Sequence, residues 1–190
     1  MGVGMDAFSR RTALRLELGS AIASIVPLGG AQAASAASID ANVESTMREF
    51  FLRVGGTREL VSKSAAVLVF PTVIKAGIGF GGEYGEGALL TRGRTLEYYN
   101  IVSASFGLQL GAQARSVIIV FMTDDALVSF RRINGWRVGV DGSVALITVG
   151  IGGSIDTSRI ASPVVGFIFD NKGLMYNLTL EGTKISRIAR

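Results

Sequence analysis

The sequence has no cysteine and no histidine among its 190 residues. Without cysteine the chain has no disulfide and no thiol catalysis, and without either residue it has no Cys/His zinc site. The missing imidazole also removes the usual general acid–base group at neutral pH and the base of a serine triad. The absence of cysteine leaves the redox compartment open, because such a chain suits an oxidising or a reducing space.

Charge is also scarce, and it is scattered. Charged residues make up 18% of the chain and hydrophobic residues 48%, which is typical of a globular, rather apolar protein. The formal net charge is +4, but no run of Lys and Arg exceeds two residues. A nucleic-acid-binding protein usually shows a concentrated basic stripe, so no nucleic-acid partner is expected. The length predicts one domain that is large enough to bury a core.

The N-terminal residues 1–33 have the pattern of an export signal. The segment SRRTALR, residues 9–15, is similar to the bacterial twin-arginine signal, and a modestly apolar segment follows at 16–28. That segment is too short and too interrupted for a membrane span, which needs ~20 residues. Residues 31–33, Ala-Gln-Ala, form the small-residue pattern that a signal peptidase accepts. We therefore expect an exported protein, periplasmic or peripherally associated with the cell envelope, with a mature domain at 34–190; an uncleaved amphipathic helix is the alternative.

Two helices are predicted at the start of the mature domain. Ser38 is a suitable N-cap, and apolar residues recur at helical spacing over residues 38–54. A Gly-Gly pair ends this helix, and Thr57 caps a shorter helix over residues 58–66. Packing of the first helix on a sheet is favoured over a membrane-facing role, because amphipathicity alone does not distinguish a lipid surface from a protein core.

The remainder of the chain has the texture of short strands. Residues 67–90 join an apolar run to six glycines, which suggests bends or close backbone approach, and predict the first hairpin of a β-rich core. An Arg-Gly-Arg turn at residues 92–94 follows it. Thr123 and two acids after it start a short helix that runs to about residue 132. The other predicted strands are 96–101, 103–113, 117–122 (buried on both faces), 136–140 and 143–151 (a hairpin across Asp141-Gly142), and 164–169 and 174–180 (a last hairpin). Residues 154–163 are the most loop-like stretch, and residues 184–190 form a short tail.

These elements predict an α+β fold. Strands dominate without sustained β-α-β alternation, which argues against a doubly wound sheet. We expect a mainly antiparallel β sandwich or partial barrel, with two N-terminal helices and one short inserted helix.

No catalytic or cofactor-binding pattern persists when its context is considered. Gly77, Gly79 and Gly82 satisfy G-x-G-x-x-G, but the residues that follow are a poor helix start and carry two carboxylates, which would repel a phosphate. Those carboxylates, Glu83 and Glu86, could form an acid pair or a cation site, but a solvated acidic turn is the favoured interpretation. We therefore expect a protein that is not an enzyme, with no cofactor and no metal site.

Three ordered segments resemble a known family. They are KAGIGFGGEYGEGALL (residues 75–90), FGLQLGAQARSVIIVFMTDDAL (106–127) and DNKGLMYNLTLEGTKI (170–185). Together they are similar to the SYLF lipid-binding domain family, and the likeness covers roughly residues 41–185. The chain is identified on this basis as a bacterial, exported member. Eukaryotic members are phosphoinositide-binding modules, some of which also engage actin, and basic residues with an N-terminal amphipathic helix are implicated in that binding.

Basic residues on the predicted helices and turns form the candidate lipid-binding site. They are Arg53, Arg58, Lys63, Lys75 and Lys172. A solvated surface is the commoner role of such residues, and the resemblance shifts the balance towards lipid. It implies that Lys75 is the lysine of the family's Lys-Ala-Gly and that Lys172 holds the basic position before Gly-Leu.

The leading functional hypothesis is a non-enzymatic domain that associates peripherally with anionic phospholipid membranes. The helix at residues 38–54 would lay its apolar edge on the lipid while basic side chains meet headgroup phosphates. The alternative is a periplasmic structural or carrier protein, in which glycine-rich strands line a cavity for an apolar ligand or form an interface with a protein partner. Salt separates the two, because headgroup binding weakens with ionic strength.

Overall fold

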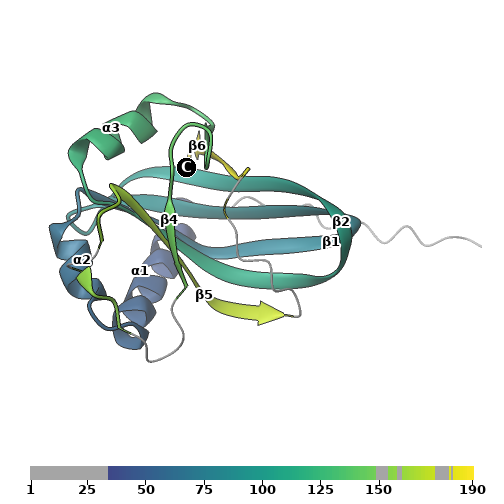
Figure 1. The fold of residues 1–190 in the computed structure, drawn as a ribbon, viewed down its shortest axis with the longest axis horizontal. Helices are drawn as coiled ribbons and strands as arrows, with labels where there is room; N and C mark the ends of the chain where they lie inside the picture. Colours follow the sequence, from purple (N-terminus) through teal and green to yellow (C-terminus); the bar gives the residue numbers. More distant parts are fainter. Residues whose placement is uncertain (1–33, 149–153, 158–159, 174–179, 181) are drawn as a thin grey trace, which may run out of the picture. The chain divides into compact units, whose positions relative to one another are not determined.

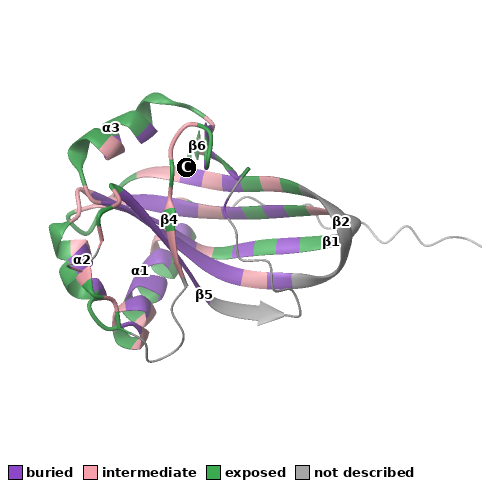
Figure 2. Ribbon diagram, viewed as in Figure 1, coloured by how far each residue is buried: buried purple, intermediate pink, exposed green. Residues whose placement is uncertain are grey.

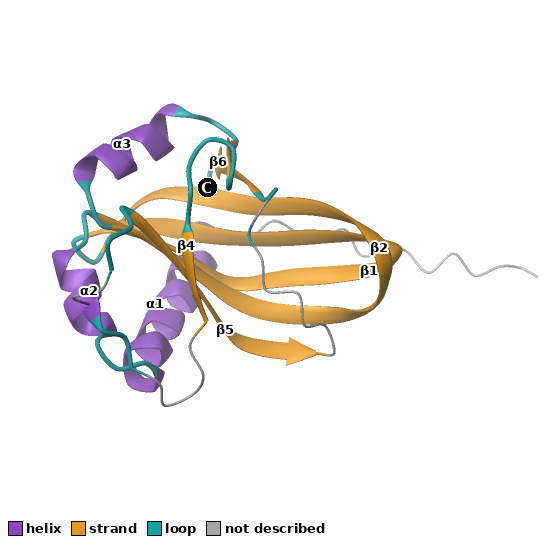
Figure 3. Ribbon diagram, viewed as in Figure 1, coloured by secondary structure: helices purple, strands orange, loops and turns teal. Residues whose placement is uncertain are grey.

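The computed structural model confirms an α+β fold built on one curled, mostly antiparallel sheet, a half-barrel (Figures 1 and 3). It describes residues 34–190 except 149–153, 158–159, 174–179 and 181; at 77–80, 105–112, 148 and 170–173 it describes the backbone alone. The described elements are α1 (Ala36–Arg53), α2 (Thr57–Lys63), β1 (Ala66–Thr91), β2 (Arg94–Phe121), α3 (Asp124–Arg132), β3 (Trp136–Arg137), β4 (Ala145–Thr148), β5 (Val164–Gly173) and β6 (Lys184–Ile188).

Strand β2 is the centre of the sheet. The sheet order is β3-β6-β2-β5-β4, and β1 pairs with β2 along nearly its whole length. On the other side of β2, strand β6 pairs with one end and β5 with the other. All these pairings are antiparallel except that of β4 with β5, which is parallel. Every other strand therefore depends on β2, directly or through one neighbour.

The β1–β2 hairpin is doubled over, so that the first and second halves of β1, which we call its two limbs, face each other (Figure 1). Register shifts at Phe70/Val73 and Ile78/Phe80 mark irregularities that bend the ladder. Where the limbs meet, glycines replace side chains: a Cβ at Gly85 would lie 2.7 Å from the Thr72 carbonyl oxygen. The prediction that residues 67–90 are themselves a hairpin is thus wrong. They are one long bent strand, and the three strands predicted between residues 96 and 122 are likewise one strand, β2.

Burial differs between the two ends of the doubled hairpin (Figure 2). Near the helices, residues 66–70 of β1 and 115–121 of β2 are buried without interruption, because one face lies inside the curl and the other lies under α1. Farther out, along residues 71–76 and 81–86, buried and exposed residues largely alternate, since only the inner face is covered. The prediction of a strand buried on both faces at 117–122 is confirmed for its residues 117–121.

Helix α1 buries its apolar edge against the outer face of the sheet. Ile39, Val43, Met47 and Phe50 recur at helical spacing and are all buried. The Phe50 ring stacks on Phe169 of β5, with centroids 5.6 Å apart, and packs at a tilt against Phe167, with centroids 5.1 Å apart. This confirms packing on the sheet. It also corrects the expectation that this edge lies on lipid, because the edge is covered by protein.

The helix ends follow capping chemistry with small shifts from the predicted positions. Ser35, not Ser38, caps α1, and its hydroxyl accepts a hydrogen bond from the Ser38 N–H at 3.2 Å. Gly56 (φ +81°) caps α2, while the Thr57 hydroxyl donates to the Val54 carbonyl at 2.7 Å. The Thr123 cap of α3 is confirmed, because its hydroxyl accepts from the Ala126 N–H at 3.3 Å.

Two predictions for the C-terminal part are wrong. No hairpin crosses Asp141-Gly142, because β3 pairs with β6 whereas β4 pairs with β5. The short tail predicted at residues 184–190 is largely a strand: residues 184–188 form β6, and Ile185 is 1% exposed. The second strand of the last predicted hairpin, at 174–180, falls almost wholly outside the described residues.

Candidate functional site

A groove of about 740 Å³ lies between α1, α2 and the turn that joins β1 to β2. Side chains from all three elements make its floor apolar; they include Val43, Met47, Phe51, Val61 and Leu90. Three of these five, Phe51, Val61 and Leu90, are only partly buried, although they pack against the core below, whereas Val43 and Met47 are buried. The groove therefore offers apolar surface that solvent can reach, beside an otherwise closed core.

The rim of this groove carries two arginines whose charge is available. Asp40 and Glu44 on α1 are already engaged: Asp40 accepts hydrogen bonds from the Thr95 and Tyr98 hydroxyls, and Glu44 pairs with Arg48 at 2.9 Å. Arg92 and Arg94, which flank the turn, are exposed and form no ion pair with any other described residue. The free charge at the mouth is positive.

The turn that presents Arg92 is strained. Arg92 has φ +51° and Gly93 has φ +75°, as in the type I′ turns that join hairpin strands. Such turns favour Asn or Gly, since the left-handed region costs a residue with a longer side chain about 1 kcal/mol. An arginine held there at a groove mouth suggests a role beyond closing the hairpin.

Beside the groove, the corner between α1 and α2 combines an exposed apolar side chain with cations. Leu52 is 80% exposed, and the Arg58 guanidinium lies 4.7 Å from the centroid of the Phe51 ring. Arg53 pairs with Glu49 at 3.7 Å, and Lys63 pairs with Glu59 at 2.6 Å. Both pairs lie at the surface, where such contacts are weak and easily exchanged.

The structure places three of the five predicted site residues on α1 and α2. Arg53 ends α1 and Arg58 lies in the first turn of α2, so both are at the corner between these helices, and Lys63 ends α2. The backbone of Lys172 pairs with Ala114 of β2, and its side chain lies outside the described residues. Lys75 is 3% exposed, so the expectation that it lies at the surface is wrong. Arg92 and Arg94 were predicted only as a turn, although two arginines directly after an apolar run were a signal.

Lys75 belongs instead to a buried ionic cluster inside the curl. Its Nζ lies 3.2 Å from Oε1 of Glu83, and Nη2 of Arg115 donates to Glu83 Oε2 at 2.7 Å. Glu83 is 5% exposed and Arg115 is 1% exposed. The expectation that Glu83 lies in a solvated turn is thus wrong. Its carboxylate joins the two limbs of β1 to β2, because the doubled hairpin brings the three side chains into one interior.

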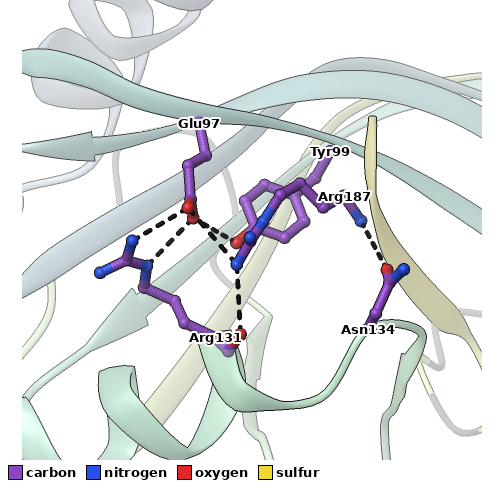
Figure 4. A network of polar contacts seen from close by, with 5 residues as sticks. All are labelled: Glu97, Tyr99, Arg131, Asn134 and Arg187. Atoms are coloured by element: carbon purple, nitrogen blue, oxygen red, sulfur yellow. Dashed lines mark hydrogen bonds and ion pairs between the residues drawn. The ribbon is translucent and has the colours of Figure 1, made fainter. Parts of the chain in front are cut away.

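A second polar network fastens α3 and the C-terminal strand to β2 (Figure 4). Glu97 accepts hydrogen bonds from Arg131 Nε at 3.0 Å and from the Tyr99 hydroxyl at 2.7 Å, and it pairs with Arg187 at 3.3 Å. The backbone N–H of Arg187 donates to Asn134 Oδ1 at 3.3 Å. The hydrogen bond from Arg131 lowers the pKa of Glu97, so this carboxylate remains ionised well into the acid range.

Tyr99 makes this network sensitive to alkali. Burial, with the hydrogen bond to Glu97, raises the pKa of Tyr99 to about 12, whereas an unfolded tyrosine titrates near pH 10. The neutral phenol is therefore favoured in the folded state, and its contribution is present below pH ~10 and lost as pH rises towards ~12. We expect the stability advantage of the native protein over Tyr99→Phe to shrink across this window in urea unfolding at stepped pH. A constant advantage up to pH 12 would contradict the assignment.

The described residues hold no arrangement typical of metal binding or of a membrane-spanning helix. Across residues 34–148 and the described parts of 154–190, no three acidic side chains are grouped so as to hold a metal ion. No helix in the same ranges has the length and hydropathy that crossing a membrane requires.

The second half of β2, with α3 and strands β3 to β6, is the part of this fold that a known family covers. Residues 102–189 match the Ysc84 family. The description of that family is Las17-binding protein actin regulator. The Ysc84 match confirms the resemblance to the SYLF family over these residues, and it agrees in general terms with lipid binding. No curated protein matches the chain. The groove elements α1, α2 and β1 precede the Ysc84 match, so the resemblance of residues 75–90 stays a prediction.

Proposed function

We propose that the protein is a non-enzymatic lipid-binding domain that takes an anionic phospholipid at the groove between α1, α2 and the β1–β2 turn. The observation that carries the proposal is an accessible apolar groove of about 740 Å³ with Arg92 and Arg94 at its mouth. An acyl chain would occupy the floor, and the headgroup phosphate would meet the two guanidinium groups, which suit phosphate geometry. The Ysc84 match supports the lipid class.

The corner between α1 and α2 would lie against the membrane during this binding. Leu52 would enter the interface, and Arg53, Arg58 and Lys63 would contact neighbouring headgroups, each worth about 1 kcal/mol near an anionic surface. Ile39 and Phe50, on the buried edge of α1, do not line the groove and take no part. With the export signal predicted at residues 1–33, the surface involved would be one that faces the periplasm.

Vesicle flotation of the full chain tests the proposal. We expect binding to vesicles that contain an anionic phospholipid, little binding to purely neutral vesicles, and weakening as salt is raised. Arg92→Gln with Arg94→Gln should lower the partition coefficient about 10- to 30-fold, since two contacts of about 1 kcal/mol each are lost. The control for the loss of an exposed positive charge is Arg137→Gln on β3, which does not line the groove, and we expect it to change binding less than about 3-fold.

A single variant separates a role in binding from a role in folding. Arg92→Asn introduces a residue that readily adopts the positive φ at this position. We therefore expect the free energy of unfolding to rise by about 0.5–1 kcal/mol while lipid binding falls. Binding that survives the loss of both arginines would refute the proposed site. Binding that does not depend on salt concentration or on headgroup charge would instead favour the alternative, in which the protein carries an apolar ligand in the same groove.

A further inference from the structure

The two ends of the described chain meet at one carboxylate, Glu86 of β1. Its Oε1 accepts a hydrogen bond from the Tyr84 hydroxyl at 2.5 Å and pairs with the Arg190 guanidinium. Its Oε2 accepts from the backbone N–H of Ala34 at 3.2 Å. The Glu86 side chain is only 9% exposed, so these contacts take up most of its surface. One oxygen therefore faces the start of the domain and the other faces its end.

Ala34 is also the residue that directly follows the predicted cleavage pattern Ala-Gln-Ala at residues 31–33. The compact unit of the chain runs from Ala33 to Arg190, so the boundary of the folded domain lies within one residue of this point. The next residue, Ser35, is the N-cap of α1. Sequence pattern and fold thus agree to within one residue on where the domain begins.

We propose that cleavage between Ala33 and Ala34 creates an α-ammonium group that Glu86 captures, so that processing itself adds an ion pair to the fold. An endopeptidase of the signal-peptidase class would add water across the amide bond. Ala33 then carries the new carboxylate, and the Ala34 nitrogen becomes an ammonium at neutral pH. The hydrogen bond from the neutral amide N–H to the Oε2 carboxylate oxygen becomes an ion pair between opposite charges, which adds their Coulomb attraction.

The surroundings of Ala34 make this carboxylate necessary. A positive charge at a helix N-terminus is opposed by the helix dipole, and α1 has no acidic residue in its first turn to offset it. Glu86 supplies the missing negative charge from the sheet. Burial acts to raise the pKa of Glu86, but hydrogen bonds from Tyr84 and Arg190 outweigh it, and the pKa is lowered. The carboxylate is thus ionised at neutral pH, where the new ammonium is also present.

The pKa of the α-amino group reports the capture. An ordinary α-amino group titrates at about 7.7–8.0. Capture by Glu86 raises that value in the folded protein, against the opposing effect of the Arg190 cation that shares the carboxylate. The added stability is full below pH ~8 and lost as pH rises through the higher folded value. With Glu86→Gln the ammonium faces only the helix dipole and Arg190, so its pKa falls below the ordinary range.

The experiment uses the full 190-residue chain expressed in a bacterial host with active export. Intact mass and N-terminal sequencing of the exported protein identify its first residue, which we expect to be Ala34. The α-amino group is then labelled with ¹³C-methyl groups and titrated by NMR. We expect its pKa to lie about one unit higher in the native protein than in Glu86→Gln, a tenfold difference in proton affinity. Glu44→Gln, an equal charge change on the exposed face of α1, is the control and should leave the pKa unchanged.

A blocked precursor gives a second measurement that does not depend on Glu86→Gln folding. Ala33→Tyr places a large residue where the peptidase needs a small one, so the Ala34 nitrogen stays an amide. We expect the processed chain to resist urea better than this precursor at pH 6.5 and to lose that advantage by pH 10. A first residue other than Ala34 overturns the proposal. An α-amino pKa that is ordinary in the native protein and unchanged in Glu86→Gln also overturns the proposal.

Discussion

Replacing Glu83 with Gln should lower the free energy of unfolding by about 3–5 kcal/mol. Glu83 lies between Lys75 and Arg115 in the interior of the doubled hairpin, and the three side chains are at most 5% exposed. Removing the charge from one member of a buried ion cluster leaves its partners' charges in a medium that solvates them poorly. The single tryptophan, Trp136, is 3% exposed and gives a fluorescence signal for urea unfolding.

Lys75→Met is the matched comparison for this result. It removes one cation but leaves the 2.7 Å contact between Arg115 and Glu83, and the methionine fills most of the lysine's volume. We expect a change within about 1 kcal/mol, because Arg115 still balances the Glu83 carboxylate and no buried charge is left uncompensated. Equal losses for Lys75→Met and Glu83→Gln would show that packing, not charge, governs this interior.

A single methyl group at Gly87 should be nearly as damaging. A Cβ there would lie 2.0 Å from the Val69 carbonyl oxygen and 2.8 Å from Cδ1 of Phe70, and the first of these atoms is backbone that cannot rotate away. Gly87→Ala must therefore separate the two limbs of β1, and we expect a loss of about 3 kcal/mol, at the upper end of ordinary overpacking.

Gly82→Ala tests whether this loss of stability comes from the steric clash of the new Cβ or from the replacement of a glycine in general. Gly82 lies on the same limb, but a Cβ there would meet only the Ser103 carbonyl oxygen at 3.6 Å, an ordinary distance. Alanine also has fewer unfolded conformations, so we expect a neutral effect or a gain of up to about 1 kcal/mol. If both variants lose the same amount of stability, the close approach of the two limbs is not the reason that position 87 requires glycine.

The sequence predicts the parts of this fold that depend on neighbouring residues. The periodicity of α1, the Thr123 cap and the Arg92-Gly93 turn all follow from spacing within a few positions. The apolar run at residues 117–121 predicts burial on both faces, because nothing polar interrupts it. Each of these signals is local, and each is confirmed.

The errors concern contacts between distant parts of the chain. The glycines in residues 67–90 indicate bends or close backbone approach. They do not show that one strand continues through the bend, because that depends on the packing of the doubled hairpin. Lys75 reads as an exposed lysine because Glu83 and Arg115 reach it from another limb and another strand. Ile185 reads as part of a tail because its partner, Ile101, is far away in sequence. The groove was unpredictable for the same reason: it needs two helices and a turn at once.

The doubled hairpin has a consequence for the order in which the chain folds. Pairing can begin at Thr91 and Arg94 and extend residue by residue to Ala66 and Phe121, so each step closes almost no new loop. Doubling the hairpin and adding β5 and β6 each require contacts across long stretches of chain, and such contacts form slowly. The hairpin is thus the natural nucleus. Formation of the β1–β2 turn requires Arg92 to adopt a positive φ, which is unfavourable for arginine. The residue that we assign to lipid binding therefore slows the first step of folding.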